Sequence, residues 1–138
     1  MSHKRSKRSY RKKGSRKGSK KGSRKVKKSQ CNSRGKKLSL ISIKKSPKKD
    51  KKYVATFCRS GRIKQTHYGA KKYQNYGGNA KLGERHLDEK RKRLYISRHR
   101  SRENWNDPTT AGALSRWTLW NKKSFRESVA DYKRRFHL

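Results

Sequence analysis

Residues 104–121 read N-W-N-D-P-T-T-A-G-A-L-S-R-W-T-L-W-N, and all three tryptophans of the chain, Trp105, Trp117 and Trp120, lie in this stretch. Only 27% of the 138 residues are hydrophobic, whereas Lys and Arg together number 45. Because large aromatic side chains dominate the apolar area that a small core can bury, we expect this stretch to form the centre of the folded part.

Asp107 and Pro108 predict the start of a helix. Aspartate accepts hydrogen bonds from the free N–H groups of a first turn, and proline has its φ preset for that turn. At helical spacing Trp117 and Trp120 share a face with Ala113, which predicts that both tryptophans are buried.

Trp105 stands in a polar loop, beside the dense polar cluster of Arg98, His99, Glu103 and Asn104. Aromatic faces also bind unstacked bases, so Trp105 is a candidate contact residue for nucleic acid. The polar cluster is interpreted as a hydrogen-bonded loop that braces the core, with a functional site as the alternative.

The C-terminal residues predict a second helix with a clear start. Ser124 and Glu127 have the spacing of a capping box, in which each side chain satisfies a backbone donor of the other residue. Apolar residues recur at steps of 4, 3 and 4 and form one stripe, which is expected to pack on Trp117 and Trp120. The stripe consists of Phe125, Val129, Tyr132 and Phe136.

Residues 53–58 and 63–68 are rich in β-branched and aromatic residues and flank the sequence R-S-G-R. Gly61 supplies the positive φ of a tight turn, so a β-hairpin is predicted. Upstream, apolar and polar residues do not alternate strictly at residues 38–43, which leaves a short strand and a docking segment as alternatives.

Residues 70–83 show no periodicity and predict a loop, whereas residues 87–99 predict a helix with acids at its start and cations at its end. Leu87, Leu94 and Tyr95 are the residues of that helix expected to face inward. The predicted fold is a small α+β domain at residues 51–138, a β-hairpin followed by about three helices. It is preceded by a basic N-terminal arm at residues 1–50.

The arm is expected to be disordered until it binds a partner. Residues 1–37 hold 18 Lys or Arg and no acid, so little apolar burial is available to offset the entropy of ordering. A Gly-Ser-cation-cation unit repeats in tandem at residues 14–17, 18–21 and 22–25. Glycine and serine keep such a segment flexible, which suits an irregular phosphate backbone.

The formal net charge of +37 and the isoelectric point of about 11.2 indicate a polyanionic partner. Nucleic acid is favoured over a membrane, because no apolar segment is long enough to span a bilayer and no basic stretch has a bulky apolar face. The start M-S-H-K-R lacks the apolar stretch of a secretory signal, so we expect action in the compartment of synthesis or in a nucleus.

Cys31 and Cys58 are expected to be free thiols, because disulfides are rare in reducing compartments. In the predicted hairpin Cys58 faces Ile63 and His67 faces Val54, so these two are poor co-ligands for a metal. With only 8 acids the chain lacks the clustered carboxylates of a metal-dependent nuclease. We therefore expect no metal, no cofactor, no small-molecule substrate and no enzymatic activity.

Ser46 begins the sequence S-P-K-K, which resembles the S-P-K-K units of linker histone tails that present two cations to the minor groove. The same pattern suits proline-directed kinases. A phosphate on Ser46 would remove up to about two units of positive charge.

Several motifs together resemble a family of short proteins of unknown function from large double-stranded DNA viruses of algae and protists. They are G-R-I-K at residues 61–64, T-H-Y-G at 66–69, Y-I-S-R-H at 95–99, E-N-W at 103–105, G-A-L-S-R at 112–116 and D-Y-K-R-R-F at 131–136. The resemblance covers about residues 53–138. It implies a viral setting, in the virion, the host nucleus or a cytoplasmic viral factory, and carries no catalytic role.

Residues 53–138 alone carry 21 Lys or Arg against 7 acids, a net charge of +14. We expect sequence-independent binding of nucleic acid, DNA favoured over RNA, in packaging or compaction of viral DNA. The alternatives are an RNA-binding protein of ribosomal type and a minor virion protein whose domain binds other virion proteins. The candidate contact residues are Arg11, Lys12, Lys13, Arg16, Lys17, Lys20, Lys21, Arg24, Lys25, Lys48, Lys49, Arg59, Arg62, Lys64, Arg91, Lys92, Arg93, Arg98 and Trp105.

Overall fold

The computed structural model describes residue 31 and residues 37–138. Three strands, β1 (Leu38–Lys45), β2 (Lys51–Arg59) and β3 (Arg62–Ala70), form an antiparallel sheet in the order β1-β2-β3. The helical elements that follow are η2 (Ala80–Leu82), α1 (Glu89–His99), α2 (Ala111–Leu114), η3 (Ser115–Leu119) and α3 (Phe125–Phe136). The predicted α+β class is confirmed. Of the arm at residues 1–50 that was predicted to be disordered, residues 1–30 and 32–36 lie outside the described residues, whereas residues 38–45 form β1.

The predicted hairpin is formed by β2 and β3. Ser60 and Gly61 connect the strands with φ angles of 49° and 77°, the positive values that a two-residue hairpin turn with the right-handed strand twist requires. The register pairs Cys58 with Ile63 and Val54 with His67, as the sequence predicted.

Strand β1 resolves the alternatives left open for residues 38–43. Its pairing with β2 shifts between Leu40 and Ser42, so the strand carries a β-bulge at this point. The bulge explains the broken alternation, because Leu38, Leu40 and Ile43 all pack against the core. The sheet therefore begins at residue 38, within the range that the sequence analysis assigned to the arm.

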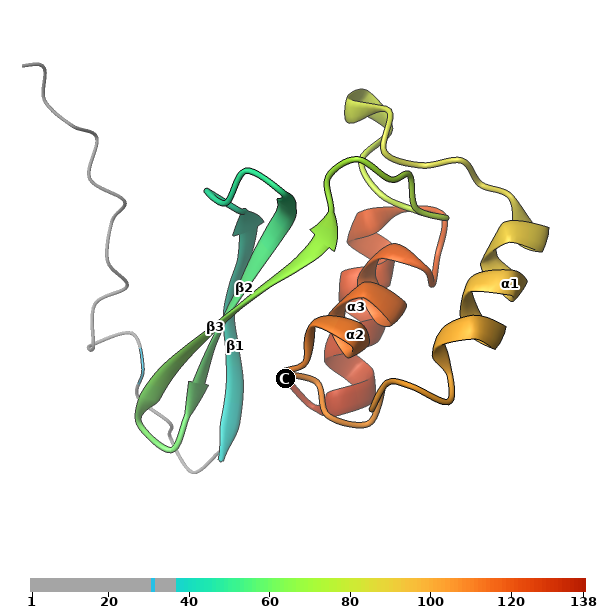
Figure 1. The fold of residues 1–138 in the computed structure, drawn as a ribbon. Helices are drawn as coiled ribbons and strands as arrows, with labels where there is room; N and C mark the ends of the chain where they lie inside the picture. Colours follow the sequence, from blue (N-terminus) through green and yellow to red (C-terminus); the bar gives the residue numbers. More distant parts are fainter. Residues whose placement is uncertain (1–30, 32–36) are drawn as a thin grey trace, which may run out of the picture.

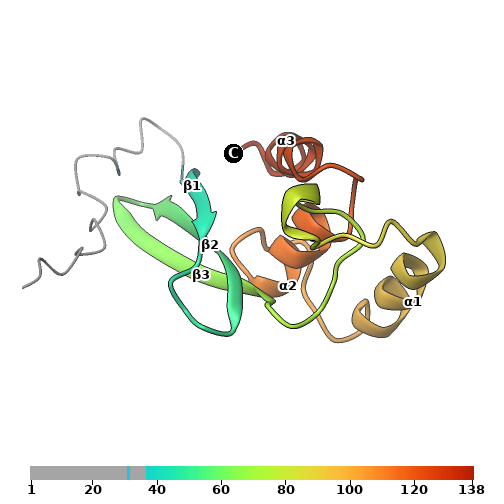
Figure 2. The same ribbon diagram turned by 90° about the horizontal axis from the view of Figure 1, so that it is seen from above.

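Helices α2 and α3 cover one face of the sheet, and α1 lies farther from it (Figures 1 and 2). β2 is the central strand and is buried from residue 52 to residue 58. Its core face meets α2, η3 and α3 in one cluster, whose buried members are Tyr53, Ala55, Phe57, Tyr68, Leu114, Leu119 and Tyr132.

The helix of the tryptophan stretch begins three residues later than predicted. Thr110, not Asp107, is its N-cap, and the Thr110 hydroxyl accepts a hydrogen bond from the backbone N–H of Ala113 at 3.1 Å. Asp107 instead closes the preceding turn by accepting from the N–H and hydroxyl of Thr109, at 3.0 and 2.8 Å. The threonines after Pro108 supply these competing caps.

Trp117 and Trp120 are half-buried, so their predicted burial is only partly met. η3 is a single π-helical turn, closed by a hydrogen bond of 3.1 Å from the N–H of Trp120 to the carbonyl of Ser115. The wider turn brings Leu114 and Leu119, five residues apart, onto the same buried face.

Helix α3 begins as predicted, with Ser124 as its N-cap, and packs on η3. Tyr132 is the fully buried member of the predicted stripe. Arg135 of α3 contacts Trp117, with its guanidinium 3.7 Å from the ring centroid of Trp117. Asp131 also pairs with Arg135, four residues later on the same helix, at 3.8 Å.

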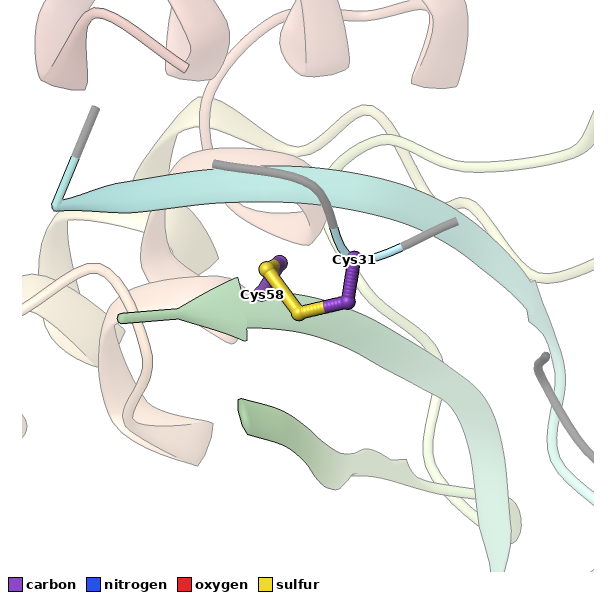
Figure 3. The surroundings of a disulfide bond; sticks show 2 residues. All are labelled: Cys31 and Cys58. Carbon is purple, nitrogen blue, oxygen red and sulfur yellow. A yellow bond between two sulfur atoms is a disulfide. The ribbon is translucent and has the colours of Figure 1, made fainter. Parts of the chain in front are cut away.

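Cys31 and Cys58 form a disulfide bond with a Cα–Cα distance of 5.2 Å, so the prediction of free thiols is wrong (Figure 3). We predicted free thiols because we expected a reducing compartment. The bond forms because the position of Cys58 on β2 brings its side chain next to Cys31. Cys58 points to the face of β2 opposite to Phe57, and the bond joins Cys31 to the sheet there.

Candidate nucleic-acid interface

The carboxylates of the described residues are used mainly to satisfy neutral donors. Six of the eight accept hydrogen bonds from hydroxyl, indole, imidazole, amide or backbone groups: Glu84, Asp88, Glu89, Glu103, Asp107 and Asp131. Within residues 37–138 the only ion pairs between Lys or Arg and a carboxylate join Asp131 to Arg134 and Arg135, at 3.7 and 3.8 Å. Most of the cations in this range are therefore not neutralised by a neighbour.

Three exposed cations meet at the β2–β3 turn, and we call Lys37, Arg59 and Arg62 the tip cluster. Arg59 and Arg62 face each other in the hairpin register, and the N–H of Ser60 donates to the carbonyl of Lys37 at 3.0 Å. The Cys31–Cys58 bond lies next to Arg59, so it joins the end of the arm to this same end of the sheet. The arm candidates between Arg11 and Lys25 are outside the described residues.

Lys48 and Lys49 are exposed in the β1–β2 turn, at the opposite end of the sheet from the tip cluster. Ser46 precedes them, and its hydroxyl lies 2.7 Å from Nδ1 of His67 and accepts from the N–H of Lys48 at 3.1 Å. Desolvation, followed by the charge of Lys48, lowers the pKa of His67. The structure thus separates these lysines from Arg59 and Arg62.

Two other predicted contact residues, Lys64 and Lys92, make internal contacts. Lys64 Nζ donates to the hydroxyl of Thr109 at 3.0 Å. Lys92 Nζ donates to the carbonyl of Asn121 at 2.7 Å and lies 4.5 Å from the ring centroid of Tyr76. Desolvation by burial lowers the pKa of Lys92. These contacts indicate a bracing role for both lysines.

Trp105 is half-buried and is also held by the fold. Its indole N–H donates to Oε2 of Glu103 at 2.8 Å, its carbonyl accepts from the indole of Trp117 at 3.1 Å, and the Arg116 guanidinium lies 5.5 Å from its ring centroid. The backbone and indole of Trp105 thus connect the polar loop to η3.

A cleft of about 650 Å³ lies between α1 and the end of β3, with α2 and η3 also contributing to its wall. Arg91 and Arg98 line it from α1 and Lys51 lines it from β2, whereas Arg93 is exposed on α1 outside it. Apolar and neutral polar residues complete the lining, among them Tyr68, Tyr73, Gln74, Asn75, Leu94, Tyr95, Leu119 and Trp120.

Two of the three residues predicted to face inward from this helix are exposed. Leu94 is 47% exposed because it borders the cleft, and Leu87, 40% exposed, lies just before the helix. Tyr95 is buried, as predicted. Sequence reasoning named Arg91 and Arg98 but missed their relation to Leu94; the spacing i, i+3, i+7 on one helix face was the available signal.

Glu103 is fixed at the edge of the cleft by the cluster that was predicted to brace the core. Its Oε1 lies 2.8 Å from Nδ1 of His99, and its Oε2 accepts from Trp105. Gly112 permits this placement, since a Cβ on Gly112 would lie 2.6 Å from Oε2. His99 in turn stacks on Tyr95 at a centroid distance of 4.3 Å, which extends the bracing to α1.

Asn104, the remaining member of that cluster, is exposed, and its side chain accepts from the N–H of Asn106 at 3.1 Å. Residues 31 and 37–138 contain no group of three His, Cys, Asp or Glu side chains placed to hold a metal ion. In the same residues no helix is long and apolar enough to cross a membrane.

Part of the chain matches a known family model. No curated protein and no solved structure matches the chain. Residues 41–99, from β1 to the end of α1, match the model of a family described as "Family of unknown function (DUF5754)".

Proposed function

We propose that the protein binds nucleic acid without sequence preference, mainly through phosphates, and has no enzymatic activity. The observation that carries this proposal is the scarcity of ion pairs between Lys or Arg and a carboxylate among residues 37–138. When many unpaired cations bind a polyanion, they release the counterions condensed on the polyanion, and this release supplies affinity.

The placement of the cations favours contacts to a phosphate backbone over contacts to bases. The tip cluster and the pair Lys48 and Lys49 lie at opposite ends of the sheet. They therefore suit an extended polyanion that runs along the sheet and contacts both sets of cations. The Gly-Ser-cation units of the arm add further charge, and contacts of such charge with phosphates carry no sequence information.

Packaging or compaction of viral DNA is the setting that we propose, with DNA favoured over RNA and other virion proteins as further partners. It rests on the resemblance of residues 53–138 to proteins of large double-stranded DNA viruses. The virion, the host nucleus or a cytoplasmic viral factory is the corresponding location. A polybasic arm on a small folded domain fits such a role because charge neutralisation is what compaction of DNA requires.

The test is the salt dependence of duplex binding by the full-length protein. In one variant the nine arm cations between Arg11 and Lys25 are replaced by Gln; in its control each Lys is exchanged for Arg and each Arg for Lys. Log affinity should fall linearly with log salt, and the Gln variant should reduce the slope by up to about 8, whereas the control keeps it. An unchanged slope in the Gln variant would rule out the arm as the main binder.

A competition between duplex DNA and structured RNA at equal salt tests the preference for DNA. RNA helices have a deep, narrow major groove and expose 2′-hydroxyl groups, so a protein built for RNA holds the RNA when both are present. We expect duplex DNA to displace RNA of equal charge; stronger retention of the RNA would favour the RNA-binding alternative.

A further inference from the structure

We infer that the cleft beside α1 binds one unpaired nucleotide of a single-stranded nucleic acid, with the base on its apolar lining and the phosphate beside Arg91 and Arg98. This inference rests on the proposed nucleic-acid binding and adds a site for a base to it. A volume of about 650 Å³ is in the range of sites for small molecules, so it accommodates a nucleotide and excludes a base-paired duplex.

The charges of the cleft favour an anion. Lys51, Arg91 and Arg98 line it, and Arg91 and Arg98 are both exposed on α1. Glu103 is the one carboxylate in the lining, and both of its oxygens already have partners, His99 and Trp105. A phosphate would therefore meet cations that form no ion pair with a carboxylate of the described residues.

Two large apolar side chains of the cleft are exposed to solvent, Tyr73 by 62% and Leu94 by 47%. Tyr73 is held by its backbone, because its N–H donates to the carbonyl of Ala70 at 3.2 Å and its carbonyl accepts from the ammonium group of Lys52. An exposed aromatic ring on an anchored backbone is a suitable stacking platform, since every base has a π face.

Asn75 adds a polar group without a partner to the residues that line the cleft. It lines the cleft and is only 4% exposed, yet its Nδ2 has no hydrogen-bond partner. Both backbone groups of Asn75 have partners: its N–H donates to the backbone carbonyl of Glu84 at 2.8 Å, and its carbonyl accepts from the backbone N–H of His86 at 2.9 Å. Buried polar groups without a partner are rare, and carboxamide side chains commonly bond to base edges.

The test measures the affinity of the full-length protein for single-stranded DNA and for duplex DNA of equal length. Arg91→Gln with Arg98→Gln removes two cations from the cleft; Arg93→Gln with Arg100→Gln removes two from the exposed surface of the same region. We expect the cleft variant to lose at least about tenfold more affinity for the single strand than for the duplex, while the control lowers both affinities equally.

The base contact has its own matched pair. Tyr73→Ala should weaken single-strand binding roughly 5- to 150-fold, the range of one stacked base, without changing duplex binding. Leu82→Ala removes a side chain that is exposed like that of Tyr73, by 47%, but lies outside this cleft, and it should change neither affinity. Circular dichroism of each variant verifies that the fold is retained.

The outcomes separate the two proposals. If the wild-type protein binds neither DNA, the proposed function fails and this inference fails with it. If both DNAs bind but the cleft variants leave their ratio unchanged, only the inference is overturned. Polyglutamate is tested as a competitor of the single strand. If its binding also depends on Arg91 and Tyr73, the inference of a nucleotide site is overturned in favour of an acidic peptide. Thymidine 5′-monophosphate that competes with this dependence would support the site and extend it to free nucleotides.

Discussion

Loss of the bond between Cys31 and Cys58 should destabilise the folded domain by a calculable amount. The bond closes a loop with a sequence separation of 27 residues. In the chain-entropy account a loop of this length restricts the unfolded state by about 3.5 kcal/mol at 25 °C. Cys31→Ser leaves Cys58 as a thiol that is 1% exposed, and a buried thiol behaves as a small apolar group. The expected loss in the free energy of unfolding is therefore close to the loop-closure value of about 3.5 kcal/mol.

Urea denaturation followed by tryptophan fluorescence measures this loss in the full-length chain. For a domain of this size the denaturant slope is about 1–3 kcal/mol per molar urea, so the midpoint should fall by roughly 1–3 M in Cys31→Ser. The wild-type protein treated with a reductant should unfold at the same midpoint as the variant.

The reductant also supplies the control, because Cys31→Ser has no bond to lose and its midpoint should not move when it is added. A loss of less than about 1 kcal/mol would show that the unfolded chain gains little freedom when the bond is absent. That result would refute the loop-closure reasoning and leave the bond without a role in the stability of the sheet.

Two further predictions concern single side chains of the helical half. Gly112→Ala places a Cβ 2.6 Å from the Glu103 carboxylate, so we expect a loss of about 1–3 kcal/mol in thermal unfolding, as overpacking commonly gives. Asp107 accepts from the backbone N–H of Thr109, which lowers its pKa below the usual 3.8. Its contribution to stability is thus present above about pH 4 and is lost as the pH falls through the folded value. Asp107→Asn keeps an acceptor without titrating, so its melting temperature should fall less steeply below pH 4; an unchanged pH profile would contradict this account.

The features that the sequence predicted correctly depend on neighbouring residues. Ser60 and Gly61 determine the hairpin and its register, because only a few residues adopt positive φ at low cost. The start of α3 follows from Ser124, whose hydroxyl accepts from the N–H of Glu127 at 3.4 Å. In both cases the signal lies within four residues, so no tertiary contact was needed to recognise it.

The features that the sequence missed depend on contacts between distant segments. The bulge in β1 is visible only once Leu40 and Ser42 have partners on β2. The π turn leaves Trp120 half-buried against the core, and an α-helical wheel cannot represent that shift. The cleft joins β2, β3, the loop at residues 73–75, α1, α2 and η3, so the sequence named some of its α1 residues and Glu103 but could not show that they meet this loop and β3.

Tyrosine supplies much of the core of this chain, which is poor in hydrophobic residues, and tyrosine hydroxyls occupy two of its acids. Tyr53, Tyr68 and Tyr132 are all buried. The Tyr53 hydroxyl donates to Glu84 at 2.7 Å, and that of Tyr132 donates to the carbonyl of Pro108 at 2.6 Å. A buried tyrosine adds a large apolar area but needs a partner for its hydroxyl.

Carboxylates that serve as such partners form no ion pair with Lys or Arg in the described part of the chain. Glu84 does this for Tyr53, and Glu89 accepts from the Tyr76 hydroxyl. A leucine-based core would leave the same acids free to form ion pairs at the surface. The choice of aromatic residues in the core thus helps to keep the surface cations unpaired, and these cations are the groups through which we propose that nucleic acid is bound.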